Sequence, residues 1–495
     1  MKLWTPSLLL VLCASAGLKA DVKPSSMFGN GMVLQREMPV PVWGHASPGE
    51  EVTVTFAGQK KSTKADLNGK WMVKLDALQA SSKGTGLTIA GKNKVAFTDV
   101  LVGEVWVCSG QSNMQMGHRG ILELAKLLPD AQKKPIRHYA VTTFVSFKPL
   151  DNCRGGWSMQ PASSAVAFGF SYYLHERLNV PVAVIQTCWG SSSIEGWMPL
   201  DMTKQLPHFA AAMEGFEKKD RTRVEKLLND AKKHPQGAPQ CWARNDNIYL
   251  RTRPNILYNA MLHPVAPFAA RGLVWYQGEA NASKPDLYAK SLPAWVKRLR
   301  KQWDRDDFHF LAVMLPGYGR VFSGNNKDVD YPDNFSWAWF REAQMTVLDL
   351  PNTGVANTID LGDAKNIHPK DKAPIGQRLA MLAARDVNGQ DVVGDGPRFK
   401  GMAVNGSTVT VTFENALGLK TKDGKPPAQF WLAGKDQKWV KAKAQIKSQT
   451  IVVANDAIKQ PVAVRYAFAG FPKVNLVNGA GFPAYPFRTD TWKRK

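Results

Sequence analysis

The chain has 495 residues, with 64 Lys and Arg against 41 Asp and Glu, so its formal net charge is +23 at pH 7. A hydrophobic content of 44% excludes a disordered chain, and this length exceeds what one core usually fills, which predicts several domains. The basic balance suits an anionic partner. The lysines are dispersed and no nucleic-acid-binding motif occurs, so we expect an acidic glycan and no nucleic acid.

Residues 1–20 have the pattern of a secretory signal peptide: a basic start, a short apolar stretch and small residues ending at Ala20. We expect cleavage after Ala20 or Ala16 and a secreted or periplasmic product. No later apolar run reaches the roughly 18 residues that a membrane span needs, so we expect no membrane partner. In an oxidising compartment Cys153 and Cys241, both in loop-like sequence, could form a disulfide.

Residues 21–98 alternate polar and apolar side chains in short runs separated by turn residues, which predicts an N-terminal β-sandwich domain. From residue 99 to about 390, apolar strand-like runs alternate with helical stretches. This alternation predicts a parallel sheet with helices on both faces, and residues 201–250 are expected to be an insertion in it. Residues 391–495 return to short β runs and predict a C-terminal β domain.

The run Val-Trp-Val-Cys at residues 105–108 predicts a buried strand, and Gly-Gln-Ser-Asn follows it at residues 110–113 as a turn into a helix. This turn places Ser112 at the carboxyl end of a strand, where ligands bind in open α/β sheets. A serine there is a candidate nucleophile. It is also a common helix cap, so its position alone does not decide between the two.

His368 is the best candidate for a base that activates Ser112. It lies in a polar loop that follows the strand-like residues 354–359 and precedes a helix predicted over residues 374–385, so it should reach the same sheet edge. His263 precedes a strand and is expected at the opposite edge. Donors for an oxyanion could come from the Ser112 N–H, from Gly190 in the turn after the strand at 182–185, and from the amides of Gln277 or Asn281.

Three motifs in this order resemble the sialate O-acetylesterase family, a branch of the SGNH hydrolases. They are Gly-Gln-Ser-Asn-Met at 110–114, Trp-Tyr-Gln-Gly-Glu-Ala-Asn at 275–281, and Asp-Leu-Gly-Asp…Asn-Ile-His-Pro…Lys at 360–372. The resemblance covers nearly all of the chain after residue 20 and is weakest over 201–250. It implies an α/β fold with a central SGNH-hydrolase-like parallel sheet, helices on both faces, and flanking N-terminal and C-terminal β-sandwich-like domains.

The resemblance implies that Ser112 is the nucleophile and His368 the base, with an oxyanion hole from the Ser112 N–H, Gly190 and Gln277. Many SGNH enzymes carry an Asp three residues before the histidine, but this chain has Lys365 there and Asn366 next to it. Asp363 is our choice for the acid that orients His368. Asp360 and a backbone carbonyl remain open alternatives.

The implied activity is removal of 9-O-acetyl and 7-O-acetyl groups from sialic acids through an acetyl-serine intermediate, with no metal or cofactor. Arg119 and Asn281 are candidate substrate-binding residues, Arg119 as a partner for the sugar carboxylate. Two alternatives stay open. The chain could deacetylate another polysaccharide such as xylan or pectin, or it could bind glycans without turnover.

Overall fold

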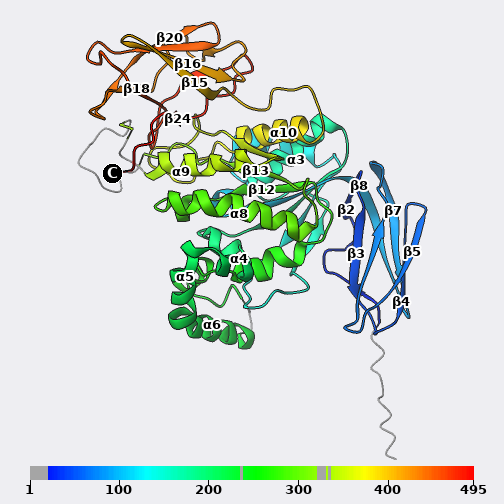
Figure 1. Cartoon of the computed structure of the whole chain (residues 1–495). Helices are drawn as coiled ribbons and strands as arrows, with labels where there is room; N and C mark the ends of the chain where they lie inside the picture. Colours follow the sequence, from blue (N-terminus) through cyan, green and yellow to red (C-terminus); the bar gives the residue numbers. More distant parts are fainter. Residues whose placement is uncertain (1–20, 235–237, 320–330, 333–335, 495) are drawn as a thin grey trace, which may run out of the picture.

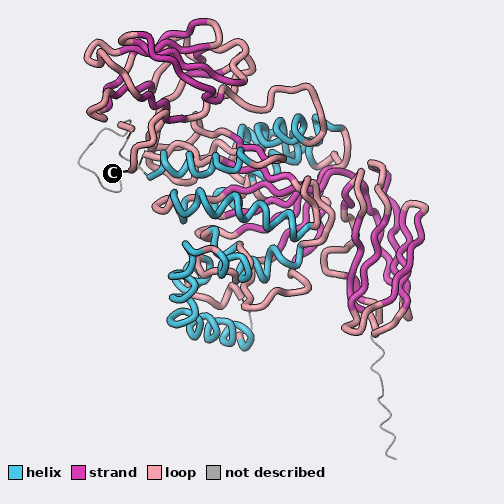
Figure 2. Tube along the Cα trace, viewed as in Figure 1, coloured by secondary structure: helices cyan, strands magenta, loops and turns pink. Residues whose placement is uncertain are grey.

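The computed structural model describes residues 21–234, 238–319, 331–332 and 336–494, so the predicted signal peptide lies outside the described residues. The described part has two β regions on either side of a central α/β region (Figure 1). Figure 2 shows that the helices lie in this central region. None of the described helices is both long and apolar enough to cross a bilayer.

The N-terminal region is built from two sheets, one of which pairs β1, β3 and β6. Burial alternates along its strands, as in β6, where Trp71, Val73 and Leu75 are buried and the residues between them are exposed. This alternation places apolar side chains between the sheets, as a β-sandwich requires. The strands are β1 Lys23–Pro24, β2 Val33–Gln35, β3 Val40–His45, β4 Glu51–Phe56, β5 Gln59–Lys64, β6 Lys70–Leu75 and β7 Ser81–Ala90.

Strand β8, Lys94–Gly110, joins the N-terminal region to the central one without a break. Its first part pairs with β7 and its residues 101–103 pair with β2, whereas residues 104–110 pair with β11. The domain boundary predicted at residues 98 and 99 therefore falls inside a strand. The 11-stranded sheet that β8 unites contains the central strand order β10-β9-β11-β8-β12-β13-β14.

The central sheet is parallel between β9, β11, β8, β12, β13 and β14, as predicted, and β10 is antiparallel to β9 at one edge. Figure 1 shows α3 and α10 on one side of β12 and β13, and α8 on the other. Burial of the strands on both faces explains their continuous apolar sequence. The strands are β9 Ile136–Val141, β10 Gly155–Ser158, β11 Val182–Cys188, β12 Gly272–Tyr276, β13 His309–Val313 and β14 Thr353–Ala356.

The helices of the central region connect these strands. They are α1 Ser112–Gln115, α2 Leu122–Ala131, α3 Ala165–Leu178, α8 Pro285–Trp303, α9 Ser336–Met345 and α10 Ala373–Asp386, with the short turns η1 Ile194–Trp197, η4 Tyr258–Leu262, η5 His263–Val265, η6 Glu279–Asn281 and η7 Thr346–Asp349. The predicted insertion forms a helical layer (Figure 1) of α4 Leu200–Gln205, η2 Pro207–Phe209, α5 Ala210–Gly215, η3 Phe216–Asp220, α6 Arg221–Lys233 and α7 Arg244–Arg251.

The C-terminal region contains antiparallel sheets with the orders β15-β16-β21-β20 and β19-β18-β22-β24, and the pair β17-β23. Two hydrogen bonds hold its last segment against the central sheet: Asn357 Nδ2 donates to Pro483 O at 2.9 Å, and the Tyr485 hydroxyl donates to Val355 O. The strands are β15 Arg398–Asn405, β16 Thr408–Glu414, β17 Lys420–Thr421, β18 Phe430–Ala433, β19 Trp439–Lys441, β20 Lys443–Lys447, β21 Thr450–Ala454, β22 Ala463–Tyr466, β23 Leu476–Val477 and β24 Phe487–Arg488.

Cys153 and Cys241 are both free thiols, so the structure does not contain the disulfide considered from the sequence. Cys153 is buried, and its Sγ lies 3.6 Å from both the Tyr139 hydroxyl and the Met27 sulfur. Burial raises the pKa of the Cys153 thiol. It is therefore a packed core side chain.

Candidate active site

Ser112 stands at the carboxyl end of β8, in the turn that the sequence predicts. Gly110 has a φ of 141°, and a Cβ at this position would lie 2.1 Å from Tyr276 O of the neighbouring strand β12, so only glycine fits. The Gln111 N–H donates to the same carbonyl at 3.0 Å. This close approach fixes the turn, and Ser112 becomes the first residue of α1, where its N–H has no acceptor within the helix.

His368 reaches Ser112 from the loop between β14 and α10. Ser112 Oγ and His368 Nε2 are hydrogen bonded at 2.8 Å, although the two residues are 256 positions apart. Burial of the ring and the positive charge of Lys372 lower the pKa of His368. The imidazole is thus held as a neutral base in contact with the hydroxyl, which is the arrangement needed to activate a serine.

The structure does not bring Asp363 or Asp360 to the His368 ring. Asp363 Oδ1 accepts the backbone N–H groups of Lys365 at 2.8 Å and Asn366 at 3.2 Å, and so closes a turn of the loop. Asp360 forms an ion pair with Arg378. Among the described residues no carboxylate is hydrogen bonded to the imidazole, so the contact with Ser112 is that of a dyad.

Gly190 lies beside Ser112, as the sequence predicts, in the turn after β11. A Cβ on Gly190 would be 3.3 Å from Ser112 Cβ, so the two backbones approach closely. The Gly190 N–H donates to Gln115 Oε1 at 2.8 Å. Gln115 is exposed, so this side chain can turn away and leave the N–H for a substrate oxygen.

Gln277 and Asn281 do not present free amides to a substrate, which differs from the roles predicted for them. Gln277 is fully buried, and its Nε2 lies within hydrogen-bond distance of Asn281 Oδ1, Ser192 O and Gln111 Oε1. Asn281 is buried as well. Its Oδ1 also accepts the Ile194 N–H, and its Nδ2 donates to Glu195 at 3.0 Å.

The physical reason for this difference is that the amides of Gln277 and Asn281 are buried and need hydrogen-bond partners within the protein. The ends of β8, β11 and β12 lie side by side, and the amides of Gln277 and Asn281 pair with the turns that follow β8 and β11. Buried amides are nearly always paired inside the protein. These two residues therefore hold the turn that carries Gly190 against the turn that carries Ser112.

A buried polar cluster, which the sequence analysis did not assign, joins the serine turn to the histidine loop. Asn113 Oδ1 accepts from Lys372 Nζ at 2.6 Å, and Asn113 Nδ2 donates to Ile367 O at 3.0 Å and to Glu279 Oε1. Burial lowers the pKa of Lys372 to about 8 and raises the pKa of Glu279. Asn113, Glu279 and Lys372 all occur in the three motifs, but nothing in their spacing showed that they meet.

Arg119 is exposed, in the turn before α2, and not on a helix. A different cation contacts the site directly: Arg251, the last residue of α7, donates from Nη1 to Gly190 O at 2.8 Å. Its guanidinium also lies over the ring of Trp189, 4.9 Å from the ring centre. Arg251 could not be predicted from the sequence, because the helical segment that carries it has no recognisable motif.

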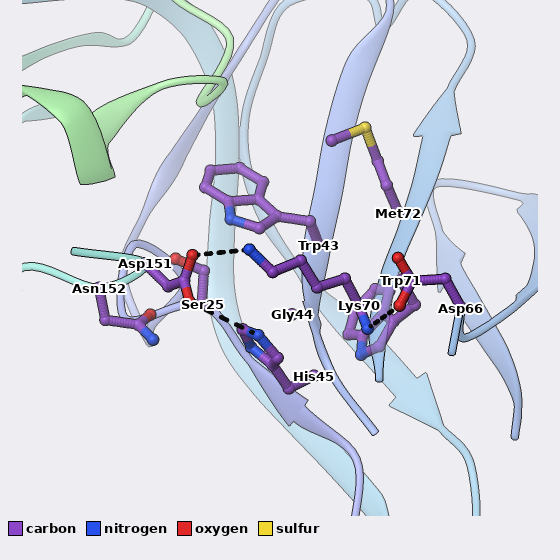
Figure 3. A pocket seen from close by; sticks show the side chains of 10 residues that line it. All are labelled: Ser25, Trp43, Gly44, His45, Asp66, Lys70, Trp71, Met72, Asp151 and Asn152. Atoms are coloured by element: carbon purple, nitrogen blue, oxygen red, sulfur yellow. Dashed lines mark hydrogen bonds and ion pairs between the residues drawn. The ribbon is translucent and has the colours of Figure 1, made fainter. Parts of the chain in front are cut away.

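A separate pocket of about 280 Å³ lies between the N-terminal region and residues 151–152 (Figure 3). Register pairs Trp43 with Met72 and His45 with Lys70 along β3 and β6. Asp151 faces this patch and forms ion pairs with Lys70 at 2.9 Å and with His45 at 3.8 Å. None of the candidate active-site residues lines this pocket, and its charged groups largely pair with one another.

Residues 102–385 match the family described as "Carbohydrate esterase, sialic acid-specific acetylesterase". The chain is 29% identical to the sialate O-acetylesterase of Mus musculus over 512 residues, covering 94% of this chain and 93% of that protein. It is 27% identical to the sialate O-acetylesterase of Homo sapiens, covering 94% of this chain and 90% of that protein.

Among solved structures, a carbohydrate acetylesterase from Xanthomonas citri superposes with a TM-score of 0.80 and 31% sequence identity. The match covers 95% of this chain and 100% of that one, and so includes both β regions as well as the central sheet.

Proposed function

Because the chain belongs to the sialic acid-specific acetylesterase family of carbohydrate esterases, we propose that it removes O-acetyl groups from sialic acids through an acetyl-serine intermediate. The 9-O-acetyl ester is the expected substrate, and the 7-O-acetyl ester a further one. The observation that carries the mechanism is the 2.8 Å hydrogen bond between Ser112 Oγ and His368 Nε2. The pattern of residues 1–20 supports the further proposal that the enzyme is exported with its signal peptide removed.

In the first step His368 Nε2 takes the proton of Ser112 Oγ as the oxygen attacks the acetyl carbonyl carbon. The carbonyl oxygen becomes an oxyanion, which the Ser112 N–H and the Gly190 N–H would stabilise once Gln115 has turned away. Collapse of this intermediate breaks the bond to the sugar oxygen, which receives the proton from His368. A water molecule deprotonated by His368 then attacks the acetyl-serine, releases acetate and returns the proton to Ser112.

The test combines labelling with acetate release from a 9-O-acetylated sialoside. We expect a fluorophosphonate to form an adduct on Ser112 and Ser112→Ala to lower kcat by about 10⁴- to 10⁶-fold. Ser109→Ala is a matched control, because Ser109 lies on the same strand, is buried and has an unpartnered hydroxyl, so its loss should leave activity unchanged. Full activity of Ser112→Ala, or an adduct elsewhere, would rule out Ser112 as the nucleophile.

A second candidate is deacetylation of another acetylated polysaccharide such as xylan or pectin. The observation that favours it is the similar Xanthomonas citri structure, which is described as a carbohydrate acetylesterase with no sialic acid named. Comparing acetate release from an acetylated sialoside and from acetylated xylan separates the two. A preference for xylan would replace the proposed substrate, and glycan binding without acetate release would favour the non-catalytic alternative.

A further inference from the structure

Arg251 is a partly buried cation beside the reacting groups that lacks an acidic partner. Within the described part of the chain its nitrogens donate to an amide oxygen and a backbone carbonyl, and none forms an ion pair with a carboxylate. Arg271, Arg378 and Arg465, by contrast, each pair with a carboxylate. Burial lowers the pKa of Arg251 with no neighbouring carboxylate to offset it, and a guanidinium stays charged in proteins nonetheless. Arg341 also lacks a carboxylate partner, but all three of its nitrogens donate to backbone carbonyls. A charged group beside reacting residues with donors still unused is a candidate for binding an anionic substrate.

The contacts that position the Arg251 side chain leave some of the N–H donors of its guanidinium group unpaired. Nε donates to Asn247 Oδ1 at 2.7 Å, one turn earlier on α7, and Nη1 donates to Gly190 O at 2.8 Å. The face of Trp189 holds the plane of the guanidinium. Nη2 has no acceptor within the described part of the chain, so Nη1 and Nη2 can still present hydrogens to a planar anion.

The position of this fork relative to the nucleophile follows from two consecutive contacts. Gly190 packs against Ser112 through its Cα side, with 3.3 Å between an added Cβ and Ser112 Cβ, and Gly190 O meets Arg251 Nη1. The guanidinium therefore lies on the carbonyl side of Gly190, one hydrogen bond away from the residue that packs against Ser112. In a 9-O-acetylated sialic acid the ester and the carboxylate are at opposite ends of the carbon chain. When the ester is at Ser112, a group that binds the carboxylate must therefore lie beyond the residues that contact Ser112.

On this basis, and resting on the proposed function, we propose that Arg251 binds the carboxylate of the acetylated sialic acid through its Nη1–Nη2 edge and sets the preference for an acidic sugar. Bidentate pairing of a carboxylate with a guanidinium is both strong and directional. The residue comes from the helical insertion, the part of the chain with the weakest family resemblance. The insertion would thus supply specificity to a Ser–His pair that can cleave any accessible acetyl ester.

The experiment compares 9-O-acetyl-N-acetylneuraminic acid with its C1 carboxamide, which keeps the ester and removes the negative charge. The wild type should prefer the acid by about 10- to 100-fold in kcat/KM, as expected for one charge-assisted pair. Arg251→Gln should lose this preference through a higher KM for the acid. Its rates with the carboxamide and with 4-nitrophenyl acetate should fall equally and by less than the rate with the acid, because loss of the hydrogen bond to Gly190 O affects both neutral esters alike. An unchanged circular dichroism spectrum would show that the variant is folded. Arg251→Lys should restore part of the preference.

Arg223→Gln is the matched control, because it removes an exposed arginine of the same insertion and should keep the preference for the acid. Equal losses on acid and carboxamide in Arg251→Gln would show a structural role and overturn the proposal. So would a wild type that hydrolyses both sialic acid esters equally, while the proposed function would stand. Loss of the preference in Arg119→Gln alone would assign the carboxylate to Arg119. A wild type that cleaves only neutral acetylated sugars would overturn both proposals.

Discussion

His368 meets Ser112 without a carboxylate on its second ring nitrogen, and this decides how the base titrates. A carboxylate on the imidazole would favour the protonated ring and raise the pKa of His368. Here burial and the charge of Lys372 act in the opposite direction. The neutral imidazole, which is the form that takes a proton from Ser112, therefore persists below pH 6.5, the usual pKa of the group.

We expect the acidic limb of the pH profile of kcat/KM to have its midpoint below pH 6.5, because activity is lost only as pH falls through the lowered pKa of His368. Initial rates between pH 4 and 8 with a neutral ester measure this limb. Asp363→Asn should leave the midpoint unchanged, since Asn keeps the Oδ1 acceptor and no carboxylate contacts the ring. A midpoint above 6.5, or a shift with Asp363→Asn, would show that an acid does act on His368.

Among individual residues, the sequence predicted that Ser112, His368 and Gly190 meet, but it did not predict the contacts of Gln277, Asn281 and Asp363. Ser112 and His368 could be predicted because each lies in a polar loop directly after an apolar strand, and such loops meet at one sheet edge. Gln277 lies after a strand too, but whether a buried amide faces a substrate or another loop depends on which turns lie opposite it. That information is spread over residues far apart in the sequence.

At the scale of the elements, Asn113 links the loops of the active site through hydrogen bonds. Its side chain contacts the histidine loop through Ile367 O, helix α10 through the Lys372 cap, and the end of β12 through Glu279. The Lys372 ammonium also lies 5.2 Å from the centre of the Tyr276 ring. Because the His368 loop has several exposed residues, this buried cluster is what holds its position relative to α1.

Asn113→Ala should lower kcat by about 100-fold with little change in KM. A small displacement of His368 from the Ser112 hydroxyl slows proton transfer but does not alter the contacts that bind the substrate. Stability should fall by about 1–3 kcal/mol, the cost of unpairing buried polar groups. Asn259→Ala is the matched control: Asn259 is buried and donates to Ser146 O and Phe147 O, away from the site. It should lose comparable stability and keep kcat. Equal kcat values for the two variants would contradict a positioning role for Asn113.

Elements with regular apolar patterns were predictable, and elements without them were not. The strands over 51–56, 272–276 and 309–313 follow from their apolar residues. Strand β5 has the sequence Gln-Lys-Lys-Ser-Thr-Lys and has no buried residue, so its pairing with β4 is set by the short turn between them and not by its own composition. Strand β10 contains two glycines and is an edge strand, and it also lacks an apolar pattern.

In the whole molecule, the N-terminal and central regions meet at Glu104, a fully buried carboxylate on β8. Arg36 Nε donates to it at 2.7 Å from just after β2, and Arg271 Nη2 donates at 2.9 Å from just before β12. Burial raises the pKa of Glu104, but the hydrogen bonds from Arg271 and Arg36 outweigh burial and hold it below its usual value. The stabilisation from this carboxylate is therefore present above about pH 4.5 and is lost as pH falls through its lowered pKa.

Glu104→Gln should lower the free energy of unfolding by about 3 kcal/mol at pH 7, because it removes the buried anion that Arg36 and Arg271 share and leaves them only the half-exposed Glu37. Urea denaturation measures this change. Asp76→Asn, which removes an exposed partner of Lys61 in the N-terminal region, should cost less than about 1 kcal/mol. A loss of stability no larger for Glu104→Gln than for Asp76→Asn would mean that the junction does not depend on this cluster.

The continuity of β8 limits how this enzyme can be trimmed for expression or recombined with other modules. The stretch that matches the esterase family begins at residue 102, in the interior of the strand that ends just before Ser112. A fragment that began there would lose β2, β7 and the first half of β8. The rest of β8, which leads directly to the nucleophile, would then lack these pairing partners. We therefore expect a catalytic fragment to need the N-terminal region. It also needs the C-terminal region, because buried Arg341 of α9 donates to Ala469 O and Gly470 O beyond the segment between α10 and β15.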